Sequence, residues 1–186
     1  MVSTLTKLKL KNFLKNDIAK KVLNNIRDEI RVEEKLEEIG DSGSLEHSLS
    51  TQQLNRLNDR LSSRKALTVG QYLRKLTSER GIYKFNSTAF GEAYIYKEYW
   101  SDLLNDKIPT YDKDKLIRVA ITLKLNLKET MKLLYKAGFT LSEENKKDEV
   151  IIFCLEEDVY DLDGINDILV DNGLPTIFSK IRSLKS

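Results

Sequence analysis

Apolar residues recur at helical intervals along most of the chain, beginning with a long stretch near the N-terminus. From Leu5 to Ile39 the apolar side chains return every four residues, with lysines early and glutamates late. The members of this stripe are Leu14, Ile18, Val22, Ile26 and Ile30. This spacing predicts one long amphipathic helix. Its stripe has to be covered, either by packing back on the rest of the chain or by pairing in a homodimer.

A polar segment with two glycines follows this helix. Residues Gly40 to Thr51 have the sequence GDSGSLEHSLST, which is typical of a turn or flexible linker. We therefore divide the chain into residues 1–50, residues 51–139 and residues 140–186. The second part opens with a short helix that has Leu54, Leu57 and Leu61 on one face.

Five further helices are predicted between Thr68 and Leu134. The first begins at Thr68, where Gln71 three residues later completes a capping-box signature. It should end at Gly81, and a new helix of about two turns should start at Asn86 to Thr88. A third helix, from Lys97 to Asn105, turns Trp100, Leu103 and Leu104 inward and Lys97, Glu98, Ser101 and Asp102 outward.

The remaining helices have equally local start and stop signals. One helix is expected from Asp112 to Leu125, and the next is capped by Asn126 and stopped by Gly138. Ser142 is a candidate cap for a helix through Leu155, although its apolar run VIIFCL also fits a buried strand. A last helix opens at Asp161 or Asp163 and closes at Asn172 to Pro175, a segment that contains Gly173.

The helix order between Thr68 and Leu134 resembles the Cro/C1 type of helix-turn-helix repressor. The similarity continues through KAGFTLSEENKKDEVIIFCLEEDVYDLDGINDILVDNGLP, which resembles a degenerate bacterial group that appends two helices to this domain. We therefore expect an all-α fold, with a five-helix repressor-like helix-turn-helix domain, an N-terminal helical extension and two extra C-terminal helices. The first 67 residues lie outside the resemblance.

This resemblance implies a DNA-binding transcriptional regulator. Phe90 to Ile95 would form the end of the second helix and the turn, and Tyr96 to Asn105 the recognition helix in the major groove of double-stranded DNA. The DNA-binding residues expected on this basis are Lys84, Ser87, Lys97, Tyr99, Ser101, Lys107 and Lys113. Lys113, Lys115 and Arg118 either hold phosphates or simply form a solvated helix start.

Three features depart from a DNA-reading repressor. The recognition helix carries Glu98 and Asp102, with Asp106 just beyond, and carboxylates oppose binding to phosphates. It has no arginine or glutamine for bidentate base contacts. Gly91 weakens the preceding helix. These features favour an alternative, a protein-interaction module on a repressor-like scaffold, such as a mobile-element or host-defence-related factor with a protein partner. The tyrosines and Trp100 then fill a core or an interface rather than stack on bases.

Charge is unevenly distributed despite a net charge of +2. Basic residues predominate over 56–84 and 107–136, acidic residues over 140–174, and Lys180, Arg182 and Lys185 are basic again. Basic stretches are compatible with DNA contact, and solvated helix faces give the same pattern. The acidic helices are either solvated faces or a docking surface for a basic partner.

The sequence offers little for catalysis. Its one histidine, His47, lies in the predicted linker, and its one cysteine, Cys154, lies in an apolar run. Neither a cysteine pair nor a histidine cluster supplies zinc ligands, and a glycine-rich phosphate loop is absent from the sequence. We therefore expect a protein that is not an enzyme, without catalytic residues, metal or cofactor. Since neither an apolar run of membrane-spanning length nor a signal core occurs, we expect a cytoplasmic location without membrane association.

Overall fold

The computed structural model describes the chain except residues 1–3, 16–17, 38–49, 63–66, 83 and 179–186. The described residues form α-helices and no strands, so the predicted all-α class is confirmed. The helices are α1 (Thr4–Lys15), α2 (Ile18–Glu37), α3 (Thr51–Ser62), α4 (Val69–Glu79), α5 (Ser87–Glu92), α6 (Lys97–Leu104), α7 (Lys113–Thr122), α8 (Leu127–Lys136), α9 (Lys146–Glu156) and α10 (Leu162–Asp171). Most of the predicted linker, His47 and the basic residues after Phe178 lie outside the described residues.

The prediction of one long N-terminal helix is wrong, because α1 and α2 are separate helices. Leu10 and Phe13 are buried on α1, whereas Ala19, Leu23 and Ile30 are buried on α2. At about 100° per residue, a single straight helix would point these two groups in mean directions about 130° apart, too far for both to face one neighbour. Two helices at an angle turn both groups inward, while Ile18 of the predicted stripe is left exposed.

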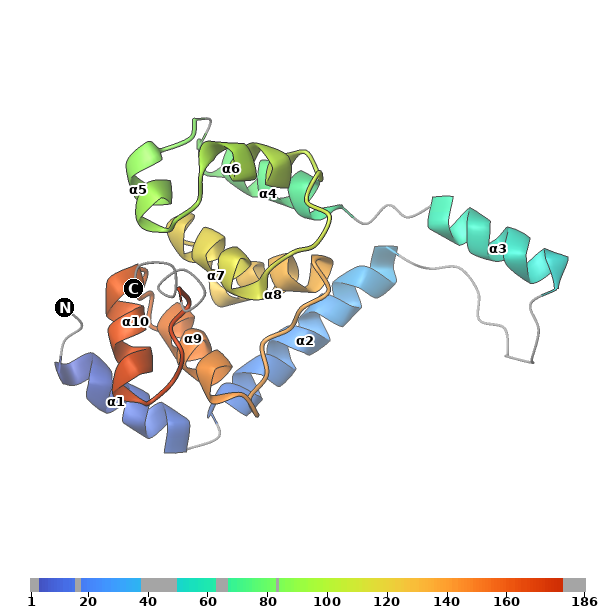
Figure 1. The fold of residues 1–186 in the computed structure, drawn as a ribbon. Helices are drawn as coiled ribbons and strands as arrows, with labels where there is room; N and C mark the ends of the chain where they lie inside the picture. The colour runs from blue at the N-terminus through green and yellow to red at the C-terminus, as the bar shows by residue number, and fades with distance from the viewer. Residues whose placement is uncertain (1–3, 16–17, 38–49, 63–66, 83, 179–186) are drawn as a thin grey trace.

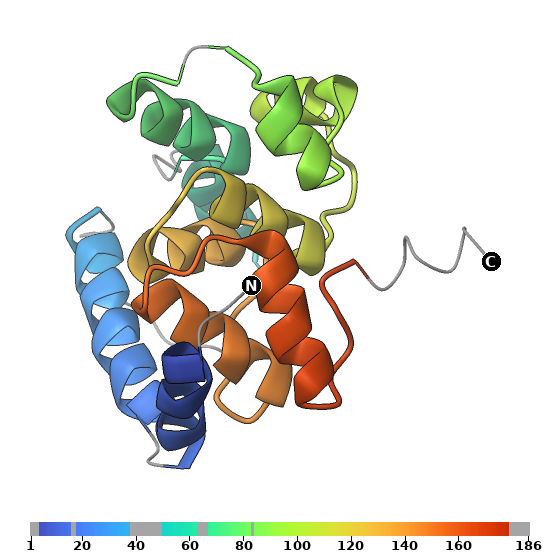
Figure 2. The same ribbon diagram turned by 90° about the vertical axis from the view of Figure 1, so that its left-hand side faces the viewer.

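The N-terminal helices pack back on the chain, which was the first of the two expected arrangements. Helix α9 contacts both of them, and it also contacts α8 and α10 (Figures 1 and 2). The rings of Phe13 and Phe153 meet edge to face, with centroids 5.3 Å apart. All six residues from Val150 to Leu155 are buried, since α1, α2, α8 and α10 surround α9. A helix that is apolar on every side is a core helix, so VIIFCL is helical rather than a strand.

Local capping signals place most helix starts correctly. Thr68 and Gln71 form the predicted capping box at the start of α4, and Asn126 and Glu129 form a second one at α8. Asn86 caps α5 through its side-chain oxygen. The predicted cap at Ser142 is wrong, because Asn145 accepts hydrogen bonds from the first-turn amides of α9.

The helices are arranged in three levels (Figure 1). Helices α4, α5 and α6 lie at one end, α7 and α8 lie in the middle, and α1, α9 and α10 lie at the other end. One hydrophobic core draws side chains from α1, α2 and α4 to α10. Helix α3 stands apart in the picture, and Leu54 and Leu57 on it are exposed. Among the described helices, none has the length and apolar character needed to cross a membrane.

Candidate nucleic-acid interface

A tight turn joins α5 to α6. Tyr94 adopts a left-handed backbone conformation, with φ of 51°. The amide of Tyr94 donates to the Gly91 carbonyl, and the amide of Ile95 donates to the Phe90 carbonyl at 2.8 Å. Phe90 and Ile95 are both buried. Backbone hydrogen bonds and two buried side chains therefore fix where α6 begins.

The inward face of α6 packs on aromatic and aliphatic side chains, as expected from the sequence. Trp100 and Leu103 are buried, and the Trp100 ring lies 4.8 Å from the Phe90 ring. Phe85 also stacks on Phe90, with ring centroids 4.9 Å apart. These aromatic rings pack against the inward face of α6, so Trp100 belongs to the core.

The end of α6 is fastened to the start of α4. The Asp106 carboxylate accepts hydrogen bonds from the Thr68 hydroxyl at 2.6 Å and from the Gly70 amide at 2.8 Å. A carboxylate at the N-terminus of a helix also interacts favourably with the helix dipole. Asp106 is thus engaged with α4 rather than standing alone beside the outward face.

The close approach of α4 and α6 depends on Gly70. A Cβ atom at this position would lie 2.5 Å from the Leu104 carbonyl oxygen and 2.8 Å from that of Leu103. The glycine therefore lets the backbones of α4 and α6 come together.

Five of the seven expected DNA-binding residues are exposed on or beside these helices. Ser87 is the first residue of α5, Lys97 is the first of α6, and Ser101 lies one turn further along α6. Lys84 precedes α5 and Lys107 follows α6. These five exposed residues are Lys84, Ser87, Lys97, Ser101 and Lys107.

Tyr99, another of the seven, is a half-buried residue of α6. Its hydroxyl is buried and has no hydrogen-bond partner among the described residues. The Lys115 ammonium lies 3.7 Å from the centre of its ring, in a cation–π contact. Burial, with a smaller effect of Asp112, raises the pKa of Tyr99 to about 12. The hydroxyl is therefore neutral and directed into the protein.

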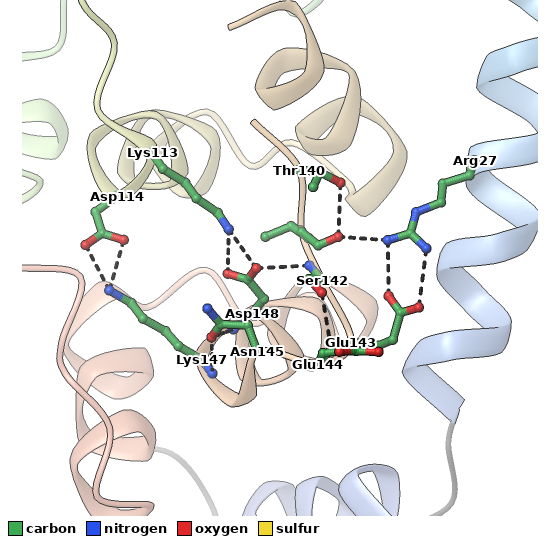
Figure 3. A network of polar contacts seen from close by, with 11 residues as sticks. Arg27, Lys113, Asp114, Thr140, Ser142, Glu143, Glu144, Asn145, Lys147 and Asp148 are labelled. Carbon is green, nitrogen blue, oxygen red and sulfur yellow. Dashed lines mark hydrogen bonds and ion pairs between the residues drawn. The ribbon is translucent and has the colours of Figure 1, made fainter. Parts of the chain in front are cut away.

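Lys113, the last of the seven, reaches inward from the start of α7. Its ammonium donates to both carboxylate oxygens of Asp148, at 2.8 and 2.6 Å (Figure 3). Beside it, Lys147 donates to both oxygens of Asp114, at 2.9 and 2.8 Å. Lys113 and Asp114 at the start of α7 thus face Lys147 and Asp148 in the first turn of α9. Each lysine pairs with the aspartate of the other helix.

The same polar network continues to helix α2. Asp148 also accepts the Ser142 amide at 2.9 Å, and Arg27 of α2 donates to Glu143 at 3.1 Å and to the Leu141 carbonyl at 3.1 Å (Figure 3). Ion pairs and the Ser142 hydrogen bond therefore link α7, α9, α2 and the loop between α8 and α9.

Arg118 is buried within α7, which neither of its two expected roles anticipated. Its guanidinium donates to the Ala93 carbonyl at 2.8 Å and lies 5.2 Å from the centre of the Phe178 ring. Burial lowers the pKa of Arg118, and the negative charges of Asp112 and Asp114 oppose this effect. The sequence contains one signal for its burial: the arginine interrupts the apolar run LIRVAI. The sequence contains no comparable signal for its contact with Phe178.

Comparisons with known proteins give no relative for this chain. Neither a protein-family model, nor a curated protein, nor a solved structure matches it. In the part of the chain that the structure describes, no three His, Cys, Asp or Glu side chains come together as a group able to hold a metal ion. The geometry around α5 and α6 is therefore the basis for a functional proposal.

Proposed function

We propose that this protein is a DNA-binding transcriptional regulator that uses α5 and α6 as a helix-turn-helix. The observation that carries the proposal is the two-sided character of α6. Trp100 and Leu103 are buried on one side, and Lys97 and Ser101 are exposed on the other. A short helix held at the edge of a molecule, with its polar side outward, has the form required for entry into a major groove.

The exposed groups suit contacts with the DNA backbone better than base reading. Lys97 supplies a cation for a phosphate, and Ser101 can donate to a phosphate or a base edge. Lys84 and Lys107 flank the helix with two more cations, and the Ser87 hydroxyl stands at the start of α5. Because phosphate contacts dominate this set, the binding should weaken steeply with salt. The proposal retains a cytoplasmic homodimer that acts without catalysis or cofactor.

A titration of the full chain onto a random pool of duplex DNA tests this proposal. Binding at low salt that falls as salt rises is expected, since each released counterion makes affinity salt-dependent. Absence of binding at low salt would exclude the proposal. Sedimentation of the same full chain, at the concentrations used for the titration, measures whether it is a dimer.

A second function, a protein-interaction module, is favoured by the side chains at the start of α6. Tyr96 is 65% exposed, and Glu98 is exposed beside it. A large exposed aromatic next to a carboxylate is more typical of a protein interface than of a phosphate-binding surface. This alternative predicts a stoichiometric protein complex that Tyr96→Ala abolishes, from a chain that does not bind duplex DNA. Duplex binding unaffected by Tyr96→Ala would argue against it.

A further inference from the structure

We propose that the segment after α10 positions the turn between α5 and α6, with Phe178 and Arg118 as the positioning residues. The role of this turn in DNA binding rests on the proposed function above. The positioning itself does not, because it concerns contacts within the chain. The proposal gives the segment after α10 a structural role in the arrangement of α5 and α6.

Arg118 acts on the end of α5. Ala93 is the residue that ends this helix, and its carbonyl accepts the Arg118 guanidinium at 2.8 Å. The last carbonyls of a helix lack partners within the helix, and a cation there satisfies both the hydrogen bond and the dipole. Arg118 comes from α7, so this bond ties the turn to the middle of the molecule.

Phe178 contacts Arg118, which donates this hydrogen bond, and Tyr94, the residue after the one that accepts it. Its ring lies 5.2 Å from the Tyr94 ring in an edge-to-face arrangement and 5.2 Å from the Arg118 guanidinium carbon. Tyr94 has a positive φ, a conformation that a non-glycine residue keeps when its surroundings enforce it. Phe178 is buried, and its ring therefore holds the side chain of this residue in place.

The segment that carries Phe178 is itself held at two points. The Ile177 amide donates to the Asn166 side-chain oxygen of α10 at 3.0 Å. The Thr176 carbonyl accepts the Lys147 ammonium of α9 at 3.3 Å, and the same ammonium is paired with Asp114. Contacts thus run from α9 and α10 through Phe178 to Tyr94, three residues before Lys97.

Phe178→Ala tests the proposal, with Phe13→Ala as the matched control. Phe13 is also buried and also makes an edge-to-face contact, with Phe153, but it belongs to α1, which lies at the end of the molecule away from α5 and α6 (Figure 1). Amide hydrogen exchange of the full chain is measured for each variant. We expect the Ile95 amide to exchange about tenfold faster in Phe178→Ala than in Phe13→Ala, since local opening governs exchange.

A conservative variant and the DNA titration complete the test. Phe178→Tyr keeps the ring and should restore slow exchange at Ile95. If the chain binds DNA, Phe178→Ala should weaken binding about tenfold with an unchanged salt slope, since no phosphate contact is removed. Equal exchange at Ile95 in Phe178→Ala and Phe13→Ala would overturn the positioning. If the Ile95 amide exchanges faster only in Phe178→Ala and the parent chain does not bind DNA, the positioning role of Phe178 is supported and the proposed function is rejected.

Discussion

The Asp148 carboxylate receives both hydrogen bonds of the Lys113 ammonium, and its side chain is 5% exposed while that of Lys113 is 27% exposed. Asp148 lies in the first turn of α9, and Lys113 is the first residue of α7. The pair therefore joins α7, which follows α5 and α6, to the buried helix α9.

Lys113→Met should destabilise the protein by about 1–3 kcal/mol, because it leaves a buried carboxylate without its cation. Urea unfolding measures the change. Lys75→Met is the control, since Lys75 and Glu79 form an exposed pair on α4 at 4.0 Å. An exposed pair of this kind is worth about 0.3–0.5 kcal/mol. Equal losses for the two variants would contradict the structural role given to Asp148.

Gly70→Ala and Gly91→Ala should change stability in opposite directions. At Gly70 the new methyl group meets the Leu103 and Leu104 carbonyl oxygens, and overpacking of this kind costs about 1–3 kcal/mol. At Gly91, an exposed position in α5, a Cβ atom meets nothing within 4 Å, and alanine should stabilise by about 0.5–1 kcal/mol. Thermal unfolding of both variants checks the two signs. A stabilised Gly70→Ala would mean that α4 and α6 are not in close backbone contact.

Tyr99→Phe should leave stability at neutral pH unchanged or raise it slightly, because the removed hydroxyl is buried and has no hydrogen-bond partner among the described residues. Its effect should appear in alkali. Burial raises the pKa of Tyr99 to about 12 in the folded protein, whereas a tyrosine in the unfolded chain ionises near pH 10. Between these values the unfolded state binds fewer protons, so stability falls as pH rises.

The alkaline decline should therefore be shallower in Tyr99→Phe than in the parent chain between about pH 10 and pH 12. Cys154 contributes to the decline in both chains, since burial raises the pKa of its thiol to about 12. Urea unfolding across this pH range measures the slopes. Tyr135→Phe removes an exposed hydroxyl and serves as the control. Identical slopes for Tyr99→Phe and the parent would contradict the burial of the Tyr99 hydroxyl.

The parts of the fold that the sequence predicts well are those determined by neighbouring residues. The capping boxes at Thr68 and Asn126 involve residues three apart, and the stop at Gly81 follows from its positive φ of 67°. The separation of α1 from α2 is not local, because it depends on both helices turning their buried faces to α9. Periodicity alone therefore joined two helices into one.

In the candidate interface too, some features depend on neighbouring residues and others on residues far away in sequence. Exposure of Lys97 and Ser101 follows from helical spacing against Trp100, and the structure agrees with that spacing. The side chain of Lys113 points inward because it pairs with Asp148, which lies 35 residues away in sequence. The contact between Arg118 and Phe178 likewise joins distant segments. A charged residue near a helix start carries no local signal of whether a partner elsewhere will bind it.

The salt dependence of duplex binding, compared between two charge-matched variants, tests the central claim most directly. One variant carries Lys97→Glu and Ser101→Glu on α6. The other carries Lys21→Glu and Asn25→Glu, which are exposed positions at the same spacing on α2. The account predicts that the α6 variant loses at least about tenfold in affinity and about 1 in salt slope, while the α2 variant stays close to the parent. Equal losses in the two variants, or a parent chain that does not bind at low salt, would contradict it.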